Sequence, residues 1–201
     1  MEPPLRWLQL PDRYLITAIE SEANADAFME RLSLALQRGI RLVQFREPAY
    51  MQESVDETYA AFQRVMQLCR SAGARCLVNS CHPESWWAQA DGVHFRAADA
   101  RLRVSRSIFA NGDEIPGLIA VSAHDAADLD VARALNADFA VLGHVLDTPS
   151  HPGEPGMGWA RFAALAGPAG LPVFAIGGQS EATLADARQH GAHGIAGIRQ
   201  L

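Results

Sequence analysis

The sequence ADFAVLGHV, residues 137–145, contains the pattern that decides the fold of this 201-residue chain. Its central apolar residues follow one another without polar alternation and end at Gly143 and the ionisable His144. A short run of this kind is typical of a strand in a parallel sheet that is covered on both faces. Seven further runs share this character. We therefore expect eight strands, at residues 14–17, 42–46, 76–79, 92–95, 118–122, 139–142, 172–176 and 194–198.

Stretches with helical spacing separate these strands. Apolar residues recur every three or four positions in 25–38 and 54–72, and similar stretches cover 126–135 and 180–190. A residue type that commonly ends helices stands between each helix and the next strand: Gly39, Gly73, Asn136 and Gly191. This alternation predicts an α/β fold, a compact (β/α)8 TIM barrel. A doubly wound open sheet is the alternative, because a count of strands does not establish closure.

The chain length fits one domain over residues 1–201. Because the sequence ends at Leu201, just after the eighth strand, we expect the barrel to lack its last helix. The apolar segment 5–8 is expected to cover part of that gap. Apolar surface left exposed there would favour a homodimer.

Composition excludes several classes of partner. The net charge is −6, and no basic run or basic-aromatic cluster occurs, which argues against nucleic acid. No apolar stretch is long enough to span a bilayer, and the first residues lack the pattern of a signal peptide. Three cysteines are an odd and sparse set, which favours a reducing cytoplasm over a disulfide framework. We therefore expect a cytoplasmic protein with no nucleic-acid or membrane partner.

Glycine-containing loops follow the last two strands, where this fold often binds phosphate. Gly177 and Gly178 come after the seventh strand and precede a helix whose free N–H groups and dipole attract an anion. Gly197 and Ile198 come at the end of the eighth. We expect these four residues to bind phosphate. The alternative is that the glycines only form tight turns.

Polar residues also mark the ends of the second, third and fourth strands. Gln44 and Arg46 alternate with an apolar residue, so they share a face toward the barrel interior and are expected to bind a ligand. The alternative is an Arg46–Glu47 ion pair with Gln44 bridging strands. Asn79 is expected to hydrogen-bond a ligand ring or a neighbouring loop. Asp99 is expected to be a helix N-cap more readily than a metal ligand.

His94, His124 and His144 lie at or just past the ends of the fourth, fifth and sixth strands. Three imidazoles could hold zinc, but no acidic neighbour completes a ligand pattern, so we expect no metal among them. A single general acid or base is the preferred interpretation, because the pKa of histidine lies near neutrality. His144 is the expected catalytic residue, and its alternative role is to anchor a loop through backbone hydrogen bonds. Other histidines are expected in a turn or at the surface: His82, His190 and His193.

The sequence resembles the thiamine phosphate synthase and thiazole tautomerase (TenI) superfamily, and is most similar to TenI-like members. The resemblance runs from Tyr14 to Ile198 and rests on the order and spacing of pieces that are not specific alone. The matching pieces are residues 14–17, 43–47, 78–79, 90–94, 121–124, 137–143, 148, 175–178 and 191–196.

Synthases of this superfamily join a pyrimidine diphosphate to a thiazole phosphate and release pyrophosphate. The resemblance implies Asn-Asp after the third strand and Gln-Glu-Asp after the fourth, with the two Asp residues holding magnesium. Here Ser80 replaces the first Asp and only Asp99 survives. Pro48 stands where the family has a lysine, and a second lysine is replaced around residues 150–152. Mg²⁺ is therefore expected, at Asp99, only if the chain is a synthase.

Tautomerases of the superfamily carry Gly-His where synthases usually carry Gly-Pro, and Gly143-His144 matches them. The resemblance therefore implies an isomerase that aromatises a carboxylated thiazole phosphate, with His144 as acid/base and no cofactor. Substrate and phosphate contacts are then expected from Gln44, Arg46, Asn79, His124, Thr148, Gly177, Gly178, Gly197 and Ile198. Two alternatives remain, a thiamine phosphate synthase and a non-catalytic module that binds a thiazole or thiamine phosphate.

Overall fold

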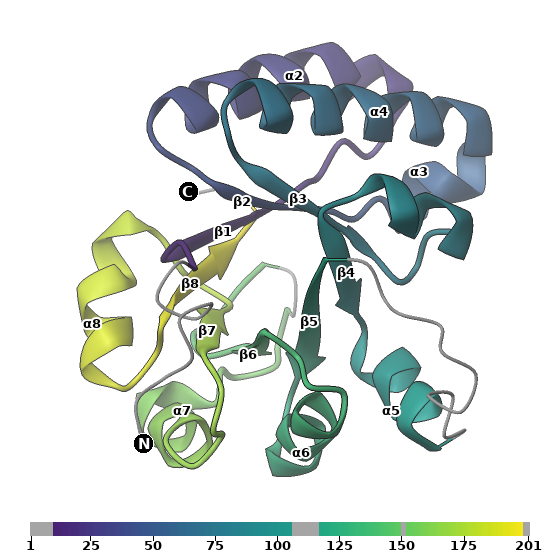
Figure 1. The fold of residues 1–201 in the computed structure, drawn as a ribbon. Coiled ribbons are helices and arrows are strands. Elements are labelled where there is room, and N and C mark those ends of the chain that lie inside the picture. Colours follow the sequence, from purple (N-terminus) through teal and green to yellow (C-terminus); the bar gives the residue numbers. More distant parts are fainter. Residues whose placement is uncertain (1–9, 106–116, 150–151, 199–201) are drawn as a thin grey trace.

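A computed structural model describes residues 10–105, 117–149 and 152–198. Eight parallel strands close into a barrel in chain order, which confirms the (β/α)8 prediction and excludes the open sheet (Figure 1). The strands are β1 (Arg13–Ile16), β2 (Leu42–Phe45), β3 (Arg75–Asn79), β4 (Gly92–Phe95), β5 (Leu118–Ala123), β6 (Phe139–Gly143), β7 (Val173–Ile176) and β8 (Gly194–Gly197). Each bound lies within one residue of the prediction, because continuous apolar runs are sharply limited in this sequence.

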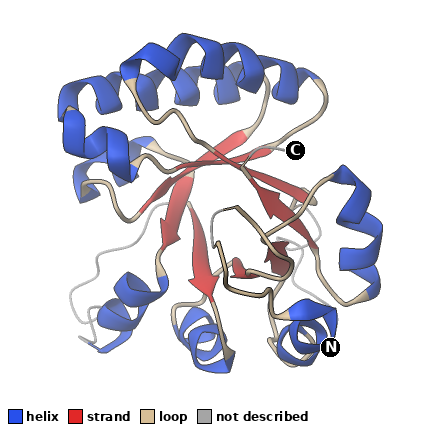
Figure 2. Cartoon of the chain, turned by 180° about the vertical axis from the view of Figure 1, so that it is seen from behind, coloured by secondary structure: helices blue, strands red, loops and turns tan. Residues whose placement is uncertain are grey.

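Helices surround the strands on the outside of the barrel (Figure 2). They are α2 (Glu22–Gln37), α3 (Pro48–Glu53), α4 (Val55–Ser71), α5 (Ala97–Ser105), α6 (Ala126–Ala134), α7 (Gly158–Ala166) and α8 (Leu184–Gln189), with 3₁₀ turns η1 (Glu84–Gln89) and η3 (Glu181–Thr183). The prediction missed α3, α5 and α7. It also treated 180–190 as one helix, whereas the chain forms η3 and then the short α8. The residues predicted to end four helices all have positive φ, as expected: Gly39, Gly73, Asn136 and Gly191.

Helix α4 shows how the sequence specifies one of these elements. The side chain of Ser54 caps the helix by accepting a hydrogen bond from the Glu57 N–H (3.3 Å). Phe62, Val65 and Cys69 recur at helical spacing and are fully buried. The cap fixes where the helix begins, and the apolar stripe fixes which face meets the barrel.

Side chains inside the barrel form a core separate from the one between strands and helices. The inner core is built around Tyr14, Phe139 and Phe174, whose ring centroids lie 5.1 to 6.0 Å apart. Such edge-on and tilted contacts are the favoured geometry for aromatic rings. The apolar filling leaves the carboxyl ends of the strands for polar side chains, which form the candidate site.

The structure describes Ile198 but nothing after it, and its described residues include no helix after β8. A groove of about 610 Å³ runs along α2 beside β1, and Leu15, Phe28 and Leu32 are among the residues that line it. The segment 5–8, expected to cover this region, lies outside the described residues. The homodimer therefore stays a prediction. None of the described helices has the length and apolar character needed to cross a membrane.

The loops after β6 and β7 pack directly on each other. The Val145 N–H donates to the Ile176 carbonyl (2.8 Å). Gly177 has a φ of +93°, and a Cβ placed on it would lie 2.3 Å from the Cβ of His144. Glycine is therefore required here for backbone conformation and for close approach. This supports the structural alternative for Gly177 and fixes the backbone at His144.

We predict that Gly177→Ala lowers the free energy of unfolding by about 2–4 kcal/mol. Of this, about 1–2 kcal/mol comes from left-handed backbone, and the remainder from overpacking, which typically costs about 1–3 kcal/mol. Gly191→Ala is the matched control, because Gly191 has a φ of +87° and no heavy atom within 4 Å of its Cβ position. Urea denaturation of both variants separates the two effects. Equal losses would refute the role of close packing.

Candidate active site at the carboxyl ends of the strands

A cavity of about 580 Å³ opens at the carboxyl ends of the strands. All ten residues predicted as catalytic, substrate-binding or phosphate-binding line it: Gln44, Arg46, Asn79, His124, His144, Thr148, Gly177, Gly178, Gly197 and Ile198. The structure thus brings together residues from six of the eight strand ends. Their location matches the prediction, while their roles stay predictions.

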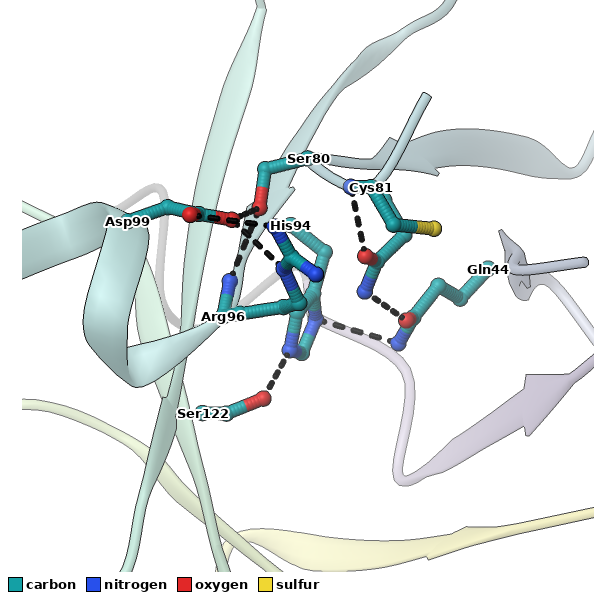
Figure 3. A network of polar contacts seen from close by, with 8 residues as sticks. Gln44, Ser80, Cys81, His94, Arg96, Asp99 and Ser122 are labelled. Atoms are coloured by element: carbon teal, nitrogen blue, oxygen red, sulfur yellow. Dashed lines mark hydrogen bonds and ion pairs between the residues drawn. The ribbon is translucent and has the colours of Figure 1, made fainter. Parts of the chain in front are cut away.

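A directed series of hydrogen bonds crosses the floor of this cavity (Figure 3). The Cys81 N–H donates to Asn79 Oδ1 (3.0 Å), so Asn79 Nδ2 is left to donate to Gln44 Oε1 (2.8 Å). Gln44 Nε2 then donates to His94 Nδ1 (3.1 Å). Gln44 is therefore a bridge between strands, as one alternative held. The orientation of its amide follows from the Cys81 backbone N–H, which is two hydrogen bonds away.

Ser122 continues the series and was not singled out from the sequence. Because His94 Nδ1 accepts, the proton of this imidazole belongs on Nε2, which donates to Ser122 Oγ (2.8 Å). The Tyr14 hydroxyl also contacts His94 Nδ1 (3.1 Å). Ser122 lines the cavity, so its hydroxyl hydrogen is free to point to a ligand. Its alternation with His124, which directly follows β5, was a signal for this position.

Burial, together with the nearby positive charge of Arg46, lowers the pKa of His94 from 6.5 to about 3. The imidazole is fully buried and neutral at physiological pH. His94 is therefore a positioning residue that orients Ser122, and it does not supply or take a proton near neutrality.

The other two candidate histidines are bound to separate partners. His124 Nδ1 lies 3.1 Å from the Asp128 carboxylate, on an imidazole that is mostly exposed. His144 Nε2 lies 3.3 Å from the Glu154 carbonyl, which is the loop-anchoring contact named as its alternative role. His144 is half-buried, lines the cavity and follows a cis peptide bond from Gly143. Its acid/base role is not tested by this geometry.

His82 lies in a turn, as expected, because its N–H donates to the Asn79 carbonyl (3.0 Å), but its side chain is buried. It stacks on Trp86 (5.2 Å between centroids), and its Nε2 accepts from the Glu47 N–H (3.1 Å). Burial lowers its pKa from 6.5 to about 4. The sequence did not predict this burial, because Phe45 and the Glu47 N–H, which also contact the imidazole, come from the end of another strand. His190 and His193 are partly buried rather than exposed.

The Glu47 carboxylate faces away from the cavity. It accepts hydrogen bonds from the backbone N–H groups of Ile19 (3.0 Å) and Glu20 (3.3 Å), tying the loop after β1 to the end of β2. Burial raises the pKa of Glu47, although these bonds and the charge of Arg46 oppose the rise. The Arg46 side chain is exposed and lines the cavity.

Asp99 lies in the first turn of α5 and is not its N-cap, because the helix begins at Ala97. Its carboxylate is held by two neighbours (Figure 3). Arg96 contacts it through Nε (2.6 Å) and Nη2 (3.1 Å), and Ser80 Oγ donates to it (2.5 Å). Partial burial raises the pKa of Asp99, but the bonds from Arg96 and Ser80 outweigh that effect, so the pKa lies below its usual value.

The residues present do not fit the magnesium site that the family resemblance implies. Ser80 brings a hydroxyl where a carboxylate is expected, and both oxygens of Asp99 are engaged by Arg96. Mg²⁺ favours carboxylate oxygens with room for water around the ion. Within residues 10–105, 117–149 and 152–198, no group of three or more His, Cys, Asp or Glu side chains could hold a metal ion.

The predicted phosphate loops have a different local structure from the one expected. The helix after Gly178 begins as the three-residue η3, closed by reciprocal bonds between Ser180 and Thr183. A turn of this length has little of the dipole of a longer helix. Any anion bound here would be held by loop backbone rather than by a helix N-terminus.

We predict that His94 makes stability pH-dependent. Its pKa is lower in the folded than in the unfolded chain, so the free energy of unfolding falls as the pH decreases from 6.5 toward 3. Between about pH 7 and about pH 5, the wild type should lose about 2 kcal/mol more than His94→Gln. Urea titrations at the two pH values measure this difference. The titration of His82 occurs in both proteins and cancels. Equal losses would show that His94 is protonated in the fold.

Known proteins with similar sequences or structures support the barrel fold of this chain. A family model described as TMP-TENI, Thiamine monophosphate synthase, matches residues 13–201. The chain is 31% identical over 202 residues to the thiamine-phosphate synthase of Thermosynechococcus vestitus, covering 100% of this chain and 54% of the relative. It is 32% identical over 173 residues to the thiamine-phosphate synthase of Salinispora arenicola, covering 85% and 80%.

One solved structure shows the same fold. Thiamine phosphate pyrophosphorylase from Pyrococcus furiosus aligns with a TM-score of 0.72 and 24% identity, covering 93% of this chain and 85% of that one. The chain spans about half the length of the Thermosynechococcus relative. Each of these three proteins is named as a thiamine-phosphate synthase or a thiamine phosphate pyrophosphorylase.

Proposed function

Because the chain belongs to the TMP-TENI family, Thiamine monophosphate synthase, we propose that it is a transferase that joins a pyrimidine diphosphate to a thiazole phosphate and releases pyrophosphate. One observation carries this proposal. A single cavity presents guanidinium groups from the ends of β2 and β4 and glycine loops from the ends of β7 and β8. In a closed barrel of eight strands in chain order, these two sides lie across from each other.

The two sides suit two different anions. Arg46 and Arg96 offer positive charge and several N–H donors, which suits a diphosphate. Gly177, Gly178 and Gly197 offer backbone without side chains, which lets a single phosphate approach closely. A cavity of about 580 Å³ lies within the usual range for small-molecule sites.

This arrangement supports the reaction through positioning and charge. With both substrates bound, the thiazole forms a bond to the carbon of the pyrimidine substrate that carries the diphosphate. The carbon–oxygen bond to the diphosphate breaks, and the leaving group takes the electron pair. Negative charge grows on the diphosphate, beside the guanidinium groups of Arg46 and Arg96. Groups fixed before the reaction stabilise such charge most effectively. Ser122, oriented by His94, supplies a hydrogen-bond donor between the two anion sites.

We predict that Arg46→Met reduces kcat/KM for pyrophosphate release about 100-fold, as expected when one donor to a developing anion is lost. The assay supplies the pyrimidine diphosphate and thiazole phosphate and measures pyrophosphate. Arg64→Met is the matched control, because Arg64 pairs with Asp26 between the outer helices α4 and α2. Loss of activity in the control, or none in Arg46→Met, would contradict the assignment.

A thiazole tautomerase is the second candidate, and His144 favours it. Its imidazole lines the same cavity, next to Gly177 in the loop that would hold a phosphate. A carboxylated thiazole phosphate would place its carboxylate toward Arg46 and its ring toward His144. The non-catalytic binding module would use the same contacts without turnover.

His144→Ala separates these candidates. A tautomerase should lose its acceleration of thiazole aromatisation in a coupled assay with an authentic synthase, while keeping affinity for the phosphate product. A transferase should keep most pyrophosphate release in the same variant. His190→Ala is the matched control, since His190 stacks on Trp159 outside the cavity (5.1 Å). No turnover in either assay would support the binding module.

A further inference from the structure

We propose that Arg96, held in place by Asp99 and Ser80, takes over the charge-neutralising part of a divalent cation, so that this chain binds the diphosphate group without a metal ion. The identity of the diphosphate rests on the proposed transferase function. The binding mode itself follows from the contacts of these three residues.

The Arg96 guanidinium is fixed in one orientation. Its Nε and Nη2 contact the two oxygens of Asp99 (2.6 and 3.1 Å), a planar two-point contact that stops the group from rotating. Ser80 Oγ donates to the same carboxylate (2.5 Å) and accepts from the Arg96 backbone N–H (3.0 Å). Ser80 thus joins the side chain of Asp99 to the backbone of the arginine that Asp99 orients.

Enough donors remain on Arg96 for a ligand. A guanidinium has five N–H donors, and Asp99 takes two, one on Nε and one on Nη2. The three left are the second Nη2 hydrogen and both on Nη1. The side chain is 51% exposed and lines the cavity. It is therefore held from one side and open to a ligand from the other.

The charges on this side of the cavity favour an anion. Arg46 and Arg96 contribute two positive charges, and Asp99 contributes one negative charge. The positive charges of Arg46 and Arg96 both act to lower the pKa of the Cys81 thiol, so both guanidinium groups lie near this residue, just after β3. The buried carboxylate of Glu47 is turned toward Ile19 and away from the cavity. Arg46, Arg96 and Asp99 together therefore carry one net positive charge.

The same contacts disfavour a metal ion. The carboxylate of Asp99 is already neutralised by a guanidinium, and a divalent cation would lie beside that like charge. The hydroxyl of Ser80 already donates a hydrogen bond to Asp99 and accepts one from the backbone N–H of Arg96. The residues that could have bound magnesium instead hold the arginine.

Calorimetric titration with inorganic pyrophosphate tests this inference. The wild type should bind pyrophosphate in EDTA, and added Mg²⁺ should not strengthen the affinity for the free anion. Arg96→Met should weaken binding in EDTA about 10- to 100-fold, as expected for hydrogen bonds to a charged group. Arg64→Met, which removes a charge outside the cavity, should bind as the wild type does. A wild-type affinity that rises tenfold or more with Mg²⁺, or an unchanged Arg96→Met, would overturn the inference.

A double substitution provides the reverse test. Ser80→Asp combined with Arg96→Ala supplies a second carboxylate and removes the guanidinium, so pyrophosphate binding should become dependent on Mg²⁺. Weak binding that Mg²⁺ does not restore would count against the view that Arg96 replaces a metal. These readouts do not depend on turnover. Metal-free pyrophosphate binding without condensation would uphold this inference and overturn the proposed transferase, whereas condensation that requires Mg²⁺ would overturn this inference alone.

Discussion

His94 is a neutral imidazole buried inside the barrel, and its two ring nitrogens fix the hydrogen-bond direction on either side. Nδ1 must accept from Gln44, because the orientation of Gln44 is set through Asn79 by the backbone of Cys81. Nε2 must then donate to Ser122. A buried polar group without partners would cost about 1–3 kcal/mol. Satisfying all of them leaves a single arrangement, and this arrangement presents a hydroxyl donor to the cavity.

Barrel closure explains why this arrangement is possible. Gln44, Asn79, His94 and Ser122 come from four consecutive strands, and closure of the parallel barrel brings the carboxyl ends of these strands to the same rim. The aromatic core below them excludes water from the other end of the barrel. On the far side, the loops after β6 and β7 are locked by direct packing at Gly177. The cavity therefore has a rigid floor and one rigid wall.

The sequence allowed the strands to be predicted to within one residue, and it identified ten residues that line the cavity. Both predictions succeeded because continuous apolar runs and strand-end positions can be identified from neighbouring residues in the sequence. Contacts between distant segments are not local. The burial of His82 depends on Phe45 and on the backbone of Glu47. The hydrogen bond from Ser80 to Asp99 likewise needed the relative placement of β3 and α5. Short helices such as α3 were missed because six residues carry too little periodicity.

The division of the cavity bears on which reaction the chain performs. The side formed by β7 and β8 offers backbone and suits a phosphate in either candidate reaction. His144 belongs to that side, where its Nε2 already meets the Glu154 carbonyl. A proton-transfer reaction needs one group of suitable pKa, whereas loss of diphosphate needs several fixed positive charges. The side formed by β2 and β4 carries two arginines, one of them oriented by a carboxylate. A monoanionic carboxylate would use only part of that charge, so the arginine side is better matched to the more highly charged leaving group.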